Sequence, residues 1–293
     1  EALRDFIREC ETPMTIGIQG DWGIGKTSLM NMLRGSDESP GSGMLPSEDC
    51  RVIRFDAWPY AQFNRAGNFA LCSLHALAGK LSPALSNAPG VDTRDLEIAV
   101  SGAQERLQEA LHLIQEGIPK GPFGKRGTDG SEWLPGYKDV SRLLLRYRQS
   151  LQELVQIWAE PDSRRRLVFF IDDLDRIAPA DTLQLLESIK NFMEVPGFVF
   201  VLAVDYDIVQ QGMVERLGAA VQKTSGKSFY DKIIQIPFVM PTASYQLEDY
   251  VVGLLRKSKF PGSEDLEDDA LGRAYFRDMT LCTVGRNPRN IKR

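Results

Sequence analysis

The sequence has 293 residues, of which 43% are apolar and 26% are charged, and its formal net charge is −5. This composition is typical of a soluble globular chain that forms one large or two small domains. The negative charge gives no general attraction to nucleic acid or to anionic lipid. Because the chain starts without methionine and its last helical pattern stops at Arg293, we expect a fragment of a longer protein.

Four scattered cysteines and two histidines limit the chemistry further. No C-x-x-C pair occurs, so the sequence predicts neither a disulfide framework nor a metal site made of cysteine and histidine. Reduced thiols favour a cytoplasmic location. No run of 18 apolar residues occurs, so we expect no membrane-spanning segment and no membrane partner.

Five short apolar runs predict five strands, at residues 14–19, 51–55, 167–171, 198–204 and 233–236. The runs are unbroken rather than alternating, which indicates strands covered on both faces, as in a parallel sheet. Helical patterns separate the runs, for example at residues 180–194. The predicted fold class is therefore α/β, with a core over residues 1–240.

The first predicted strand leads into G-x-x-x-x-G-K-T, the pattern of a phosphate-binding P-loop. Its glycines let consecutive backbone N–H groups turn toward a phosphate, and the following helix adds its N-terminal dipole. We expect Lys26 to reach the β- and γ-phosphates and the Thr27 hydroxyl to ligate Mg²⁺. The residues expected to bind the nucleotide are Gly20, Asp21, Trp22, Gly23, Ile24, Gly25, Lys26, Thr27 and Ser28.

A long insertion, at about residues 85–165, separates the second strand from the third. Residues 93–116 and 139–159 each place apolar side chains on one helical face, the second at the alternating four and three spacing of a heptad seam. The glycine- and proline-rich residues 117–137 join them, which predicts a helical hairpin with a mobile tip. The seam packs either on the body, which we favour, or on a partner.

Two adjacent acids, Asp172 and Asp173, end the third strand. A carboxylate at such a strand end is placed to ligate Mg²⁺, and Asp172 is assigned that role. Asp173 is the candidate for the base that orients and deprotonates the attacking water; the alternative is a capping or salt-bridging residue. Asp175 and Arg176 complete a charged cluster, in which Arg176 could instead face the nucleotide of a neighbouring subunit.

The fourth strand ends in Asp205. A polar residue at this strand end can lie beside the γ-phosphate, so Asp205 is a candidate sensor. Its negative charge favours contact with water or lysine over contact with phosphate. The alternative is that Asp205 caps the next helix.

Residues 241–293 predict a small helical lid, with helices at 244–257 and 266–283. Asn287-Pro288 then forms a helix N-cap followed by a proline in the first helical position. Arg289 would lie in the first turn and reach back to a γ-phosphate, or it is a surface arginine. The chain contains no [NT]-K-x-D run, the usual guanine-reading element, which favours ATP over GTP.

Taken together these motifs resemble the KAP family of P-loop NTPases, a group close to the AAA+ and STAND ATPases. The matching pieces are GDWGIGKTS at 20–28, FDAW at 55–58, DDLDR at 172–176, AVD at 203–205, YDKIIQIPF at 230–238 and NPRNIKR at 287–293. The resemblance implies a five-stranded sheet of the order 5-1-4-3-2 with a helical lid. Many KAP proteins carry transmembrane helices between the two ATP motifs, whereas this chain carries the charged hairpin.

The leading interpretation is an ATPase that acts as a conformational switch or assembly machine, with ATP and Mg²⁺ as ligands. A homo-oligomer, or a partner protein in a multi-component system, is expected. Soluble bacterial KAP proteins resemble parts of antiphage defence systems, an association that fold alone does not establish. Two alternatives stay open: a nucleic-acid-stimulated motor, although no basic stripe or stacking platform indicates nucleic acid as a partner, and a scaffold that binds ATP without hydrolysing it.

Overall fold

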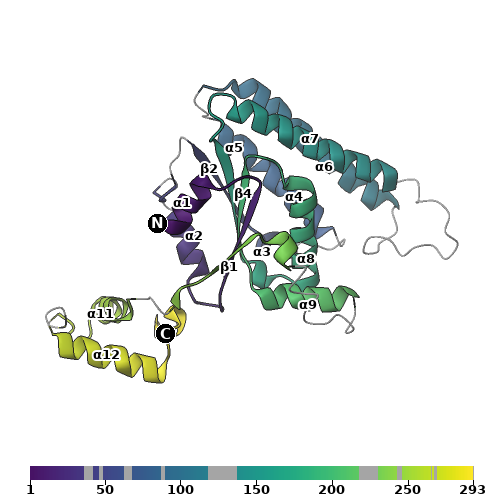
Figure 1. Ribbon diagram of the computed structural model, residues 1–293. Helices are drawn as coiled ribbons and strands as arrows, with labels where there is room; N and C mark the ends of the chain where they lie inside the picture. Colours follow the sequence, from purple (N-terminus) through teal and green to yellow (C-terminus); the bar gives the residue numbers. More distant parts are fainter. Residues whose placement is uncertain are drawn as a thin grey trace.

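A computed structural model describes residues 1–35, 42–45, 49–62, 68–86, 90–117, 137–217, 230–242, 246–264, 266 and 269–292. Five parallel strands form one sheet in the order β2-β3-β4-β1-β5 (Figure 1). Read from the opposite edge this is 5-1-4-3-2, so the predicted α/β class and strand order are confirmed. The strands are β1 (Met14–Gln19), β2 (Cys50–Asp56), β3 (Arg166–Asp172), β4 (Phe198–Ala203) and β5 (Ile236–Val239).

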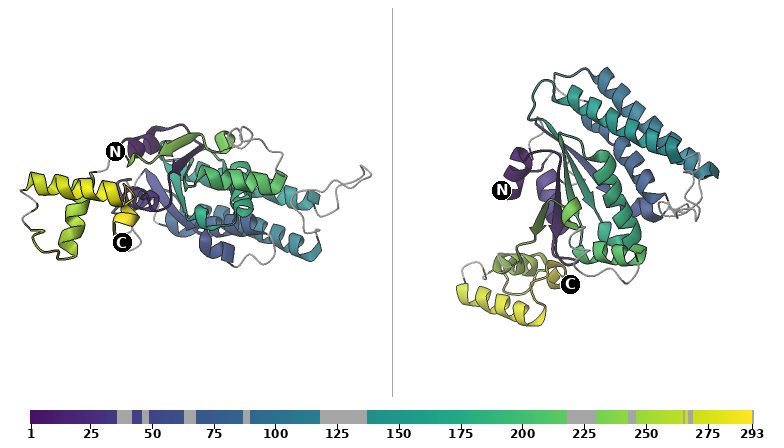
Figure 2. Two further views of the ribbon diagram at one scale, coloured as in Figure 1. Left: turned by 90° about the horizontal axis from the view of Figure 1, so that it is seen from below. Right: turned by 45° about the vertical axis from the view of Figure 1, so that its right-hand side comes forward.

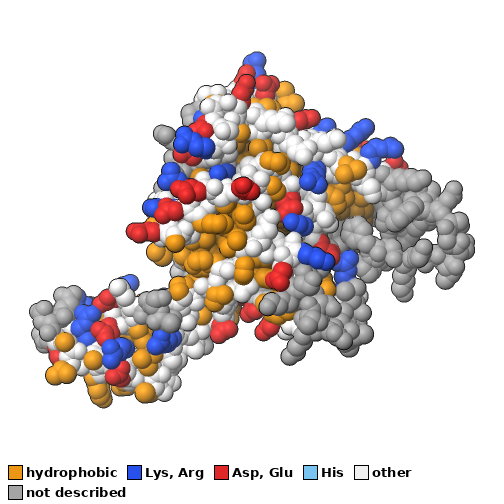
Figure 3. Space-filling model, in the orientation of Figure 1, with side chains coloured by type: hydrophobic (Ala, Val, Ile, Leu, Met, Phe, Trp, Pro, Cys, Tyr) orange, Lys and Arg blue, Asp and Glu red, His pale blue; other side chains and the backbone are white. Residues whose placement is uncertain are grey.

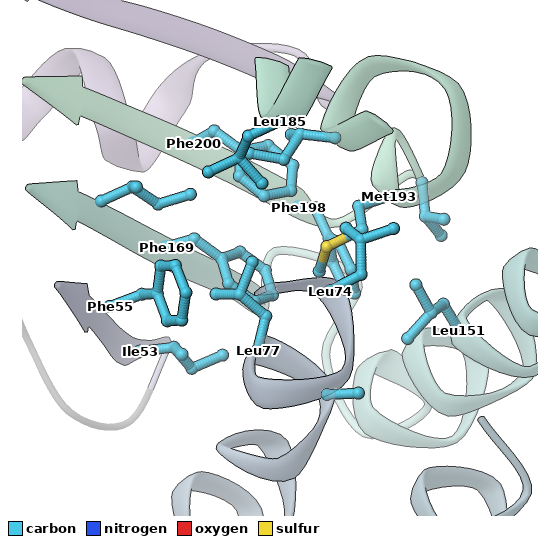
Figure 4. Packing of buried hydrophobic residues seen from close by; sticks show 14 of the residues in the cluster. Ile53, Phe55, Leu74, Leu77, Leu151, Phe169, Leu185, Met193, Phe198 and Phe200 are labelled. Carbon is cyan, nitrogen blue, oxygen red and sulfur yellow. The ribbon is translucent and has the colours of Figure 1, made fainter. Parts of the chain in front are cut away.

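The central strands are buried on both faces, which explains their unbroken apolar sequence. Along β3, Val168 and Phe170 belong to one core layer and Phe169 to the other, and all three side chains are fully buried. Figure 4 shows the second layer, in which Phe169 packs beside Phe198 and Phe200. The sheet is therefore a rigid base, and its carboxyl-end residues are held in place by the core beneath them.

Helices cover the two faces of the sheet unequally (Figure 1). On one face lie α1 (Ala2–Glu9) and α2 (Lys26–Arg34), and on the other lie α4 (Phe69–Gly79), α8 (Pro179–Ser188) and α9 (Tyr206–Leu217). The helix predicted at 180–194 is confirmed, except that its last turn is the π-helix η2 (Ile189–Met193). Shorter helical segments are α3 (Trp58–Gln62), α5 (Leu81–Leu85) and η1 (Leu174–Arg176).

The fifth strand was predicted at residues 233–236 and that prediction is wrong by three residues, because β5 begins at Ile236. Ile233 and Ile234 lie at the end of a helical turn in which the Ile234 N–H donates to Tyr230 O at 2.8 Å. Both isoleucines are buried, so their apolar character reflects packing under the sheet rather than strand pairing. A short apolar run does not by itself distinguish these two cases.

The insertion forms the predicted helical hairpin, α6 (Thr93–Gly117) and α7 (Tyr137–Ala159). Its seam is buried in the main core cluster together with sheet residues, so the preferred interpretation, packing on the body, is confirmed. The buried seam residues are Leu96, Val100, Ala103, Leu107, Ala110, Val140, Leu144, Tyr147, Leu151, Leu154 and Trp158. The predicted mobile tip falls on residues 118–136, outside the described residues.

The lid consists of α11 (Leu247–Lys257), α12 (Ala270–Thr283) and α13 (Pro288–Lys292). It lies at the opposite end of the molecule from the hairpin (Figures 1 and 2). The helix predicted from residue 266 begins later, at Ala270, because the Asp269 carboxylate caps it by accepting the N–H groups of Leu271 and Gly272. Within the described ranges, no helix combines the length and the apolar content that crossing a membrane requires.

Candidate functional site at the P-loop

The P-loop connects the end of β1 to the start of α2 at the carboxyl edge of the sheet. Gly23 and Gly25 have φ angles of 86° and 105°, a left-handed backbone that favours glycine. These turns bring the loop around the N-terminus of α2, where unpaired backbone N–H groups can bind an anion. Thr27 and Ser28 lie in the first helical turn, and both are exposed.

Lys26 is the only cationic side chain in the loop, and it is 7% exposed. Its Nζ donates to Gly20 O at 2.6 Å and lies 3.8 Å from Asp175 Oδ2. The ammonium group is therefore held between the P-loop backbone and the acids that follow β3. This is the link between the two halves of the predicted site.

Asp172 ends β3 and is 4% exposed. Its Oδ1 accepts the N–H of Asp173 at 2.8 Å, and its backbone carbonyl accepts the N–H of Ala57 at 3.2 Å. The parallel register also pairs Asp172 with Asp56, the last residue of β2. Two carboxylates therefore end neighbouring strands at the same edge.

Asp173 adopts a left-handed backbone, with φ 59°, which is uncommon for a residue other than glycine. Its Oδ1 pairs with Arg176 Nε at 3.0 Å. Burial raises the pKa of this carboxyl group, as do the nearby Asp172 and Asp175, while Arg176 opposes the rise. Strained backbone of this kind concentrates at functional sites, and the contact also matches the salt-bridging alternative.

The charge network predicted within DDLDR is present in part. Arg176 pairs with Asp173 within its own chain, and its guanidinium lies 5.3 Å from the ring centroid of Trp58. Asp175 pairs with Lys26. Each charged member of the DDLDR run therefore has a polar or charged contact at the site, and the carbonyl of the buried Leu174 accepts the Thr182 hydroxyl at 3.1 Å.

Asp205 follows β4, as predicted, and its Oδ1 accepts the N–H of Asp207 at 3.1 Å in the first turn of α9. This hydrogen bond supports the alternative that Asp205 caps α9. Asp205 also lies near Tyr230, whose hydroxyl accepts a hydrogen bond from Gln19 Nε2 at 2.8 Å. Burial, more than the Asp205 charge, raises the pKa of Tyr230 to about 12. A contact of Asp205 with the nucleotide stays a prediction.

The lid touches the P-loop directly at residues 22 and 23. Asn287 caps α13 as predicted, because its Oδ1 accepts the N–H of Arg289 at 3.0 Å, and its Nδ2 donates to Trp22 O at 2.9 Å. The Arg289 guanidinium carbon lies 3.8 Å from the centroid of the Trp22 ring. Arg289 Nη1 is shielded from solvent and has no hydrogen-bond partner among the described residues.

A family model described as the KAP family P-loop domain matches residues 1–293, the whole chain. The chain belongs to this family. The KAP domain is also similar to the phage T7 exclusion protein of Escherichia coli (strain K12), with 21% identity over 260 residues. The matched region is 79% of this chain but only 30% of the exclusion protein, so the chain spans less than a third of that relative's length.

The KAP domain brings most of its predicted site residues together. Lys26 pairs with Asp175, which follows Asp172 and Asp173 after the end of β3, and Arg289 reaches the P-loop from the lid. Asp56 was not among the predicted site residues, although an acid directly after a predicted parallel strand was the signal available. Trp22 was predicted only as part of the loop pattern. Among the described residues, no group of three His, Cys, Asp or Glu side chains is arranged to hold a metal by itself.

Proposed function

We propose that this KAP domain binds ATP with Mg²⁺, hydrolyses it to ADP and phosphate, and acts as a conformational switch or assembly ATPase. The observation that carries the proposal is the 3.8 Å separation of Lys26 Nζ and Asp175 Oδ2, which joins the P-loop cation to the acidic end of β3. A P-loop and a strand-end acid are the two halves of the site in this class of enzyme.

The residues present fit a magnesium nucleotide. The loop offers backbone N–H groups and one cation to the phosphates, and Thr27 with Asp172 offers the hard oxygen donors that suit Mg²⁺. When bound, the ion neutralises charge on the phosphate oxygens. Lys26 would exchange its bond to Gly20 O for phosphate oxygens, because an ammonium group makes its strongest hydrogen bonds to anions.

Asp173 would accept the proton of the attacking water. Its raised pKa, caused mainly by burial, makes it a better proton acceptor than an exposed aspartate. Arg176 Nε lies 3.0 Å from Asp173 Oδ1, and its charge lowers the pKa of Asp173 and so weakens it as a proton acceptor. That effect supports slow, controlled turnover. It also supports the second candidate, a scaffold that keeps ATP intact.

Phosphate release by the purified protein separates these candidates. We expect release from ATP with Mg²⁺, loss of release when EDTA removes the metal, and weaker release from GTP. No release from bound ATP would favour the scaffold. Stimulation by DNA or RNA that weakens with added salt would favour a nucleic-acid motor. On the face in Figure 3, basic and acidic side chains are interspersed, which argues against the motor.

The biological role proposed for the domain is antiphage defence in the bacterial cytoplasm. Its support is the similarity to the phage T7 exclusion protein of Escherichia coli. The domain would work as a homo-oligomer or with a partner protein. A neighbouring subunit or an additional domain could then read the position of the lid.

Arg289 is proposed to contact the γ-phosphate when ATP is bound. Arg289→Ala should therefore erase most of the difference in affinity between ATP and ADP while leaving ADP binding nearly intact. One charge-assisted hydrogen bond contributes about 1.5–3 kcal/mol, or roughly a ten- to hundredfold preference for ATP. Calorimetric titration of both nucleotides measures this ratio.

The matched control is Arg286→Ala, because Arg286 lies in the same lid segment and donates to Thr242 O at 3.5 Å. The control should keep the parental ratio. Equal losses of ATP and ADP affinity in Arg289→Ala would show that the side chain holds the lid structurally. An unchanged ratio would remove Arg289 from the sensor role.

A further inference from the structure

The P-loop carries an exposed tryptophan whose position the phosphate-binding pattern does not require. Trp22 is 57% exposed, and the Arg289 guanidinium lies on its ring face at 3.8 Å. The only part of Trp22 that the pattern uses is its backbone, so its side chain is available for another task.

Residues 22 and 23 form the contact surface for α13. The Asn287 side chain donates to Trp22 O and accepts the N–H of Arg289, so the residue that caps α13 also attaches this helix to the P-loop. A β-carbon on Gly23 would lie 2.8 Å from Arg289 Cβ and 2.9 Å from Asn287 Oδ1, which leaves no room for a side chain there. The first turn of α13 is thus fitted closely to the P-loop backbone.

The stack leaves the hydrogen-bonding edge of Arg289 available. A guanidinium group stacks through its flat face, whereas its N–H donors point outward in the plane. Arg289 can therefore rest on Trp22 and donate to an anion at the same time. Its Nη1 is shielded from solvent and has no hydrogen-bond partner within the described part of the chain, an arrangement that favours an acceptor such as a phosphate oxygen.

We propose that Trp22 is a positioning residue that holds Arg289 on its ring face so that the lid arginine can distinguish ATP from ADP. The inference rests on the proposed function of Arg289. The P-loop then has two tasks: its backbone binds the phosphates, and its Trp22 side chain positions the arginine that contacts the γ-phosphate. In the proposed switch, a nucleotide shifts the lid only if its affinity differs between two lid positions. The contact with Trp22 stabilises Arg289 in the lid position seen in this structure.

The test compares Trp22→Ala with Trp22→Phe. Loss of a cation–π contact should lower the ATP/ADP affinity ratio of Trp22→Ala by about two- to thirtyfold. Trp22→Phe retains an aromatic face and should restore most of the ratio. Met32→Ala is the control for loss of exposed apolar surface, because Met32 is 61% exposed on α2, and it should keep the parental ratio. Calorimetric affinities for both nucleotides are the readout.

A double variant makes the test specific. If Trp22 acts through Arg289, Trp22→Ala should lower the ratio no further in an Arg289→Ala background, since the effects of coupled residues are not additive. Additive effects, failure of phenylalanine to restore the ratio, or equal weakening of ATP and ADP would overturn the proposal. Absence of ATP binding by the parental protein would instead refute the proposed function.

Discussion

Lys26→Ala should abolish tight binding of ATP in the presence of Mg²⁺. The substitution removes the only side-chain cation of the P-loop, whose Nζ lies between Gly20 O and Asp175. Two charge-assisted hydrogen bonds to phosphate would be lost, which lowers the affinity by at least about a hundredfold. Isothermal calorimetry with ATP measures the loss directly.

Lys190→Ala is the matched control for this experiment. Lys190 also pairs with a carboxylate, Glu194, but it lies in η2 rather than in the P-loop. This variant should bind ATP as the parental protein does. An unchanged ATP affinity in Lys26→Ala, with the fold intact by circular dichroism, would refute the assignment of the phosphate site.

Asp173→Asn should keep ATP bound while slowing its hydrolysis by about 10²–10⁴-fold, the usual loss when a positioned base is removed. Asparagine has the shape of aspartate but cannot accept the proton from water. The substitution also removes the charge that pairs with Arg176. Phosphate release at saturating ATP and an independent affinity measurement separate catalysis from binding.

Two further variants serve as comparisons for Asp173→Asn. Asp172→Asn should weaken the Mg²⁺ dependence of binding itself, because Asp172 is the proposed metal ligand. Asp139→Asn, on the exposed surface of α7, should change neither property. Hydrolysis at the parental rate in Asp173→Asn would place the base elsewhere and would strengthen the scaffold interpretation.

The sequence predicted the parts of the site that are contiguous in the chain. The P-loop is a local backbone structure, and the turns at Gly23 and Gly25 follow from glycine alone. The acids after β3 were found because a strand buried on both faces has an unbroken apolar sequence that stops at its carboxyl end. The hairpin was predicted because its apolar seam repeats at helical spacing, which is also a local pattern.

The parts that were missed depend on residues far apart in the chain. Asp56 reaches the site only because β2 pairs with β3 in one particular register. The stack of Arg289 on Trp22 depends on the placement of the lid, which no local pattern contains. The start of β5 was misplaced because Ile233 and Ile234 are buried at the end of a helical turn. A buried isoleucine looks the same in the sequence whether it lies in a strand or in a helical turn.

A single-turnover experiment with protein in excess over ATP tests the central claim most directly, because it follows the fate of ATP held in this site. The account predicts that the parental protein with Mg²⁺ converts the bound ATP to ADP and phosphate, whereas Asp173→Asn retains it as ATP. If the parental protein binds ATP as tightly as Asp173→Asn does and the ATP stays intact, hydrolysis at this site is contradicted.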